Sequence, residues 1–149
     1  RDSMNQKAPE IKAFTVFMKA SQSVERLIKQ DFLKKEISFN EYAILELLYH
    51  RGEQPTQSIV KRVLMGDGSI TYVIDKLKEK GFIKRRPGQK DRRKIYAGLT
   101  KKGKNYMDQR VVEQEAIIHK IFDDLNDEEV EIAIDLLKRI GIHADNLLK

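Results

Sequence analysis

Apolar residues recur at three- and four-residue intervals over much of the chain, with polar residues between them, and this spacing predicts helices. The first such stretch runs from about Pro9 to Lys34. Its apolar positions spread over more than one stripe of the helix surface, which indicates burial against two surfaces. We expect one of them to be the chain's own core and the other to be a second subunit.

Capping signals mark the boundaries of three further helices. The run Ser-Phe-Asn-Glu at 38–41 matches a capping box, and it opens a helix that stops at Arg51 and Gly52. Thr100 caps a long helix that runs to about residue 124. The run Asn-Asp-Glu-Glu at 126–129 is a second capping box, which opens the last helix. The pattern predicts a mainly α protein with long helices at both ends.

The middle of the chain has the pattern of a helix-turn-helix. A short helix opens at Thr56 and runs through Leu64, and the turn at 66–68 holds two glycines that permit a sharp reversal. The next helix ends at Gly81. Its apolar stripe, at positions i, i+3, i+4 and i+7, consists of Ile70, Val73, Ile74 and Leu77. The opposite face is polar, as expected of a helix that enters a DNA groove.

A small hairpin is predicted directly after this helix. Residues 82–86 and 95–99 are short extended segments, joined by a basic loop that contains Pro-Gly. The combination predicts a winged helix-turn-helix with a small β-wing. Charge agrees, because residues 55–104 hold 15 Lys and Arg against 4 Asp and Glu, whereas the remainder holds 14 against 19. A basic middle between less basic ends indicates a nucleic-acid-binding module.

Composition excludes several other classes. No apolar run approaches the ~20 residues that span a bilayer, and the N-terminus lacks a signal pattern, so we expect a cytoplasmic protein without a membrane partner. The absence of cysteine excludes disulfides, thiolate metal sites and thiol redox sensing in this chain. His50, His119 and His143 have no paired ligand spacing, and no catalytic pattern is recognisable. We therefore expect no metal, no cofactor and no enzymatic activity.

Three strings carry a resemblance to a known family. They are Ser-Ile-Thr-Tyr-Val-Ile-Asp-Lys-Leu at 69–77, Lys-Gly-Phe-Ile-Lys-Arg-Arg at 80–86, and Asp-Arg-Arg at 91–93 running into Leu-Thr-Lys-Lys-Gly at 99–103. With this order of elements, the chain resembles the multiple antibiotic resistance regulator (MarR) family of bacterial transcription factors. The third string matches that family's Asp-x-Arg, Leu-Thr and Gly pattern. The first is similar to a subgroup that represses genes for handling quinones and other aromatic electrophiles.

The resemblance implies an obligate homodimer in which the first, fifth and sixth helices of the two subunits interleave. It also implies that this dimer binds a palindromic operator. We therefore divide the chain into an N-terminal dimerisation helix (1–36), a winged helix-turn-helix DNA-binding lobe (37–100) and C-terminal dimerisation helices (101–149). The terminal helices also carry more apolar surface than one small wing domain can cover, which supports a dimer. A symmetric dimer would place two recognition helices about 34–36 Å apart, in successive major grooves.

Candidate DNA contacts come from three elements. The groove-facing side of the recognition helix is predicted to consist of Ser69, Thr71, Tyr72 and Lys76. Hydroxyl groups can bind base edges or phosphates, and a tyrosine ring can contact a thymine methyl group. Arg93 at the wing tip suits a narrow minor groove, with Asp91 orienting it. Phosphate contacts are expected from Thr56, Gln57, Lys84, Arg86, Lys90 and Arg92. The alternative is an ordinary solvated helix face and a solvated charge run in a loop.

A ligand pocket is a further prediction. Phe14, Phe17, Phe39 and Tyr42 are candidates to line a cleft between the dimer base and the DNA-binding lobe, where members of the resembled family bind phenolic ligands. The alternative is that they belong to the core.

These patterns together favour a sequence-specific, dimeric regulator of transcription. We expect a repressor that leaves its operator when a small aromatic effector binds. Two alternatives stay open, namely a non-specific DNA-compacting protein and a winged-helix protein-interaction module.

Overall fold

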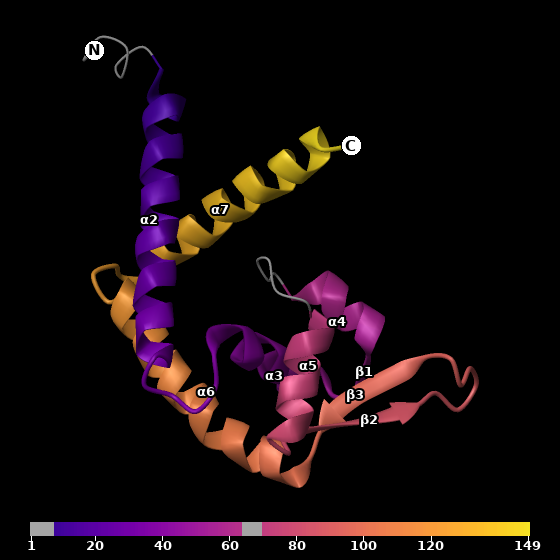
Figure 1. Ribbon diagram of the computed structural model, residues 1–149. Coiled ribbons are helices and arrows are strands. Elements are labelled where there is room, and N and C mark those ends of the chain that lie inside the picture. Colours follow the sequence, from indigo (N-terminus) through magenta and orange to yellow (C-terminus); the bar gives the residue numbers. More distant parts are fainter. Residues whose placement is uncertain (1–7, 64–69) are drawn as a thin grey trace. The chain divides into compact units, whose positions relative to one another are not determined.

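The computed structural model describes residues 8–63 and 70–149, which are mainly helical with one small antiparallel sheet (Figure 1). The helices are α2 (Pro9–Phe32), α3 (Phe39–Arg51), α4 (Thr56–Arg62), α5 (Ile70–Glu79), α6 (Lys101–Phe122) and α7 (Asp127–Leu147). The strands are β1 (Gln54–Pro55), β2 (Ile83–Pro87) and β3 (Ile95–Leu99). The fold confirms the predicted mainly α winged helix-turn-helix. The predicted turn at 66–68 lies outside the described residues.

Both predicted capping boxes are confirmed. Ser38 Oγ accepts a hydrogen bond from the Glu41 backbone N–H at 3.1 Å, and Glu41 Oε1 accepts one from the Ser38 N–H at 2.9 Å. Asn126 and Glu129 form the same reciprocal pair at the start of α7. Each box satisfies backbone donors that the first turn of a helix otherwise leaves without partners. The helix starts are thus fixed by local sequence.

The recognition helix α5 is seated by its apolar stripe. Val73, Ile74 and Leu77 are buried, as predicted, and Ile70 packs against the core more loosely. The rest of this core comes from the end of α2, from α3 and α4, from the strands and their flanking residues, and from the start of α6. Its fully buried side chains include Ile44, Leu45, Ile59, Phe82 and Met107. Burial of this stripe leaves the polar side of α5 facing outward.

The C-terminal end of α5 is held by polar contacts. Lys80 Nζ lies 2.9 Å from Glu41 Oε2 and donates to the Glu36 carbonyl at 3.1 Å. The Thr100 hydroxyl donates to the Gly81 carbonyl at 2.6 Å and accepts from the Gly103 N–H at 3.0 Å. These contacts link the end of the recognition helix to the capping box of α3 and to the first turn of α6.

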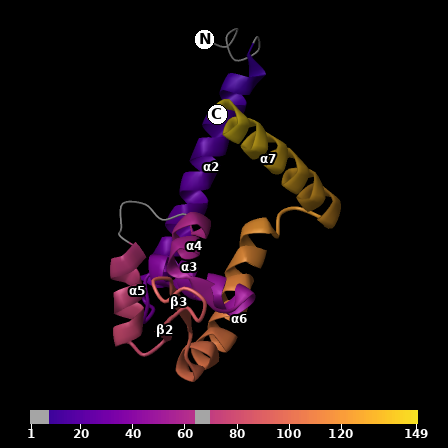
Figure 2. The same cartoon turned by 90° about the vertical axis from the view of Figure 1, so that its right-hand side faces the viewer.

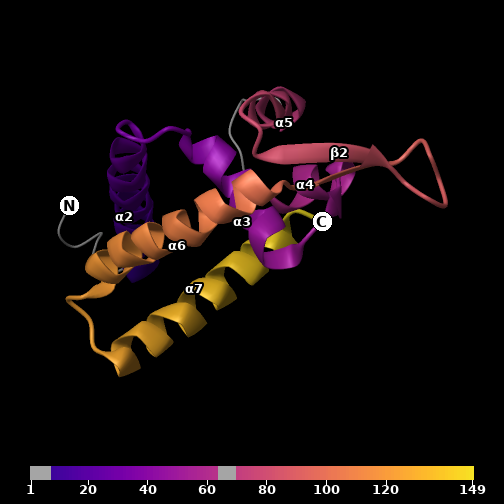
Figure 3. The same ribbon diagram turned by 90° about the horizontal axis from the view of Figure 1, so that it is seen from below.

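The sheet has the strand order β1-β3-β2, and both pairs are antiparallel. In the β2–β3 hairpin Lys84 faces Gly98 and Arg86 faces Tyr96. Figure 2 shows α5 and the beginning of α6 on opposite sides of this hairpin. Its loop extends beyond α4 and α5 (Figure 3). The two-residue strand β1 was not predicted from the sequence.

The chain forms two compact units, one reaching to Val111 and one from Val112 to Lys149. In the first unit, Phe32 at the end of α2 packs against Phe39 and Tyr42 of α3, with ring centroids 5.8 and 5.3 Å apart. In the second unit, α7 has no buried residue. Within the described ranges, none of the helices has the length and apolarity that crossing a bilayer requires.

Candidate DNA interface

The outward face of α5 carries side chains of three chemical kinds. Thr71, Tyr72 and Lys76 are exposed opposite the buried stripe, as predicted, whereas Ser69 lies outside the described residues. Tyr72 is 61% exposed, and Lys76 Nζ lies 5.4 Å from its ring centroid. A hydroxyl, an aromatic ring and an ammonium group therefore share one helix face. Asp75 on the same helix forms an ion pair with Arg85 of β2, which links α5 to the wing.

At the wing tip, Asp91 orients Arg93. The Asp91 carboxylate accepts hydrogen bonds from the Arg93 backbone N–H at 3.0 Å, from Nε at 3.1 Å and from Nη2 at 3.3 Å. These bonds lower the pKa of Asp91. The bonds from the Arg93 side chain have the larger effect, and the bond from its backbone N–H adds to it. The Arg93 side chain is nevertheless 92% exposed. The guanidinium is thus aimed by its neighbour and still presented to solvent.

The wing tip and the start of α4 meet around a surface hollow of about 330 Å³. It is lined by Pro55, Thr56, Gln57, Asp91, Arg93, Lys94 and Ile95. Two predicted phosphate contacts from α4 therefore lie beside the predicted groove contact from the wing. Lys94, which was not among the predicted contacts, also lines this hollow. Nothing but its basic charge in the loop distinguished it in the sequence.

The other predicted basic contacts are more scattered. Lys90 and Arg92 are exposed and form no ion pair with any residue in the described ranges. Lys84 lines a separate hollow beside Tyr49 of α3, away from the one at the wing tip. Arg86 is paired with Glu53, a partner that was not predicted because the two residues are 33 positions apart.

A MarR family model matches residues 37–95 of the chain. The HTH-type transcriptional regulator MhqR of Bacillus subtilis is 37% identical over 134 residues, which cover 90% of this chain and 92% of that protein. The chain belongs to the MarR family. Likeness to MhqR agrees with the subgroup suggested by the recognition-helix string. The MarR-family chain is accordingly a DNA-binding transcriptional regulator, and its relatives are named as regulators rather than enzymes.

Solved structures share this MarR-family fold. A mutant of Escherichia coli MarR complexed with operator DNA superimposes with a TM-score of 0.74 at 21% identity, covering 89% of this chain and 96% of that one. The structure of Bordetella bronchiseptica BpsR concerns regulation of DNA binding by 6-hydroxynicotinic acid. It superimposes with a TM-score of 0.75 at 22% identity, and the match covers 85% of this chain and 91% of that one. At these identities the likeness establishes the fold.

The four aromatic residues predicted for a ligand pocket do not line one cavity within a single chain. Phe14 and Phe17 are exposed on α2, whereas Phe39 and Tyr42 pack around Phe32. Because a helix rises 1.5 Å per residue, Phe14 lies about 27 Å along α2 from Phe32.

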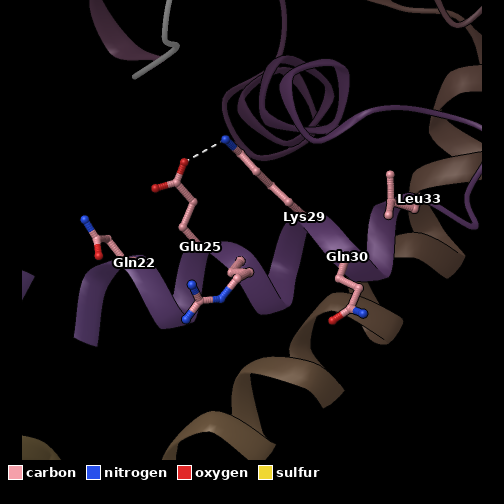
Figure 4. A pocket seen from close by; sticks show the side chains of 6 residues that line it. Gln22, Glu25, Lys29, Gln30 and Leu33 are labelled. Atoms are coloured by element: carbon pink, nitrogen blue, oxygen red, sulfur yellow. Dashed lines mark ion pairs between the residues drawn. The ribbon is translucent and has the colours of Figure 1, made fainter. Parts of the chain in front are cut away.

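A different hollow, of about 530 Å³, lies on α2. Gln22, Glu25, Arg26, Lys29, Gln30 and Leu33 line it (Figure 4). Glu25 and Lys29 form an ion pair across its rim at 2.7 Å. None of its lining residues is aromatic, so it is not the pocket predicted from the sequence. No group of three or more side chains suited to hold a metal ion occurs among residues 8–63 and 70–149.

Proposed function

We propose that this MarR-family regulator is a repressor that binds an inverted-repeat operator as a homodimer and leaves it when a small aromatic molecule binds. The observation that carries the DNA contact is Arg93, an exposed guanidinium that Asp91 orients at the wing tip. A slim, permanently charged group in this position suits the electronegative minor groove. Because the proposed operator is part of the chromosome, we also expect the protein to act in the cytoplasm.

In this proposal the interface has three kinds of contact. The outward face of α5, with Thr71, Tyr72 and Lys76, reads base edges in the major groove. Arg93 enters the adjacent minor groove. The hollow shared by α4 and the wing supports phosphate binding by Thr56 and Gln57, and further phosphate contacts come from the remaining predicted basic residues, Lys84, Lys90 and Arg92. Ser69 belongs to the same proposed set.

Unburied apolar side chains support the homodimer. In α2 they are Ile11, Phe14, Val16, Phe17, Met18, Val24 and Leu27. In α7 they are Ile132, Ile134, Leu136, Leu137, Ile140, Ile142 and Leu147. Burying one such side chain contributes about 1.5–3 kcal/mol of free energy, and extended exposed apolar surfaces mark interfaces. The proposed assembly assigns dimerisation to residues 1–36 and 101–149, and DNA binding to residues 37–100.

Release by an effector requires that the effector bind one conformation of the dimer more tightly than the other, because equal affinity shifts no equilibrium. The resemblance to regulators of aromatic-electrophile genes supports an aromatic effector, as does the BpsR structure with its aromatic acid. Exposed Phe14 and Phe17 are candidates to contact it, together with Phe39 and Tyr42 if dimerisation brings the two pairs together. With no cysteine, thiol oxidation is not the trigger in this chain.

Selection of duplexes from a random DNA pool, at near-physiological salt, tests the proposal. We expect enrichment of an inverted repeat whose half-site centres are about one helical turn apart, roughly 34–36 Å. Binding without enrichment would instead favour a DNA-compacting protein, and no binding would favour a protein-interaction module. A reporter placed behind the enriched site then separates repression from activation, and aromatic compounds can be screened for release of the same probe.

A further inference from the structure

The two arginines of β2 have different partners. Arg85 pairs with Asp75 of α5, whereas Arg86 pairs with Glu53, which lies just before β1. Glu53 Oε1 accepts hydrogen bonds from Arg86 Nε at 2.9 Å and from Nη2 at 2.5 Å. Arg86 Nη1 donates to the Pro87 carbonyl at 3.1 Å. Three of the five N–H groups of Arg86 are therefore hydrogen-bonded within the protein, although its side chain is 44% exposed.

One face of the same guanidinium is covered by Tyr96. Arg86 Cζ lies 4.7 Å from the Tyr96 ring centroid, and the two residues are cross-strand partners in the β2–β3 register. A guanidinium over an aromatic face is attracted by the ring, and it is also restrained there. A phosphate contact uses outward N–H groups, ideally two in parallel. Arg86 has three N–H groups bonded within the protein and one face stacked, so a phosphate would have to compete with Glu53 for a parallel pair of N–H groups.

Glu53 reaches Arg86 by crossing the middle strand of the sheet. The strand order is β1-β3-β2, and Glu53 adjoins β1 whereas Arg86 belongs to β2. Gly98 of β3 lies on the path, because a Cβ there would stand 3.3 Å from Glu53 Cγ and 3.5 Å from Glu53 Oε2. The glycine leaves room for the carboxylate side chain on this face. The Glu53–Arg86 pair consequently ties one edge of the small sheet to the other.

We propose that Arg86 is a positioning residue that holds the wing through Glu53, and that it is not a phosphate contact. This inference rests on the proposed function, and it replaces the role predicted for Arg86 from the sequence. The two roles make opposite predictions for Glu53. If Arg86 bound phosphate, removing the Glu53 charge would free the arginine and reduce repulsion of DNA, so affinity would rise. If the pair holds the wing, the same change lowers affinity.

The test compares Glu53→Gln, Arg86→Gln and the double variant on the selected operator over a range of salt concentrations. We expect each single variant to bind roughly two- to fivefold more weakly, the size of a part-exposed ion pair. The double variant should bind the operator at least as tightly as the weaker-binding single variant does. In all variants, the slope of log affinity against log salt should stay at the wild-type value. Tighter binding by Glu53→Gln, or a slope reduced by about 0.9 in Arg86→Gln, would overturn the proposal.

Two controls separate this inference from the proposed function. Arg92→Gln, at a wing arginine outside the described ion pairs, shows how much the slope changes when a wing charge is lost. Amide hydrogen exchange in the DNA-free protein gives an independent readout at Tyr96 and Ala97, which pair with both β1 and β2. We expect faster exchange there in Glu53→Gln and Arg86→Gln, and unchanged exchange would refute a positioning role. Hydrogen exchange therefore tests the positioning role of Arg86 even if the wild-type chain selects no operator.

Discussion

Arg93→Ala tests the DNA contact of the wing with little expected effect on folding. The Arg93 side chain is 92% exposed, and its partner Asp91 is 38% exposed. Losing a solvent-exposed pair changes the free energy of unfolding by about 0.5 kcal/mol or less. Losing a guanidinium from a DNA groove costs about 1–3 kcal/mol, or roughly 5- to 150-fold in affinity. The expected result is a folded protein that binds its operator poorly.

The assay is a fluorescence anisotropy titration of the labelled operator with wild type, Arg93→Ala and Arg139→Ala. Arg139 is a matched control, because it is exposed on α7 and pairs within its own helix with Asp135 at 3.6 Å. Adding Asp91→Asn to Arg93→Ala removes the carboxylate that the first change leaves unpaired. If affinity stays low in that double variant, the loss belongs to Arg93 itself. Affinity equal to that of the Arg139 control would refute the wing contact.

Three further substitutions test other parts of the molecule. Leu137→Asp places a charge in the proposed dimer base, which should weaken the free energy of dimer association by at least about 2 kcal/mol. If sedimentation still shows a full dimer, the interface lies elsewhere. The Tyr49 hydroxyl donates to Asp108 at 2.5 Å, and this bond raises the pKa of Tyr49 above 10.0. Because the folded pKa is the higher one, the resulting stability is present below pH 10 and is lost as pH rises through the folded value. In an absorbance titration, Tyr49→Phe should lose one tyrosine that ionises at a higher pH than a free tyrosine does. In Gly103→Ala the new Cβ would overlap the Phe82 carbonyl group, so we expect destabilisation of about 2 kcal/mol or more in urea unfolding; an unchanged midpoint would contradict this close approach.

Features set by local sequence were the most predictable. The capping boxes at Ser38 and Asn126 need only residues within one turn, and the stripe of α5 needs only the helical period. The strand β1 escaped prediction because two residues, Gln54 and Pro55, are too few to show a period. Its pairing with β3 depends on residues about 40 positions further along the chain.

The candidate site was predictable in outline, because charge and motif point to α5 and the wing. The Asp91–Arg93 contact was predictable because the two residues are two positions apart. The partner of Arg86 was not, since the Glu53–Arg86 pair joins distant positions through the strand order of the sheet. The aromatic pocket of Phe14, Phe17, Phe39 and Tyr42 stays a prediction, because it depends on the dimer. Spacing on a helix says which side chains share a face, but not that Phe14 and Phe39 lie far apart in one chain.

Thr100 illustrates how narrow the tolerance of a single position can be. Its one oxygen both donates to the Gly81 carbonyl and accepts from the Gly103 N–H. Serine could keep both bonds, whereas valine, of almost the same shape, would lose both and leave two backbone groups without partners. In a saturation-mutagenesis library selected for repression, only serine should survive readily at this position. The threonine of the family's Leu-Thr pattern thereby gains a chemical explanation.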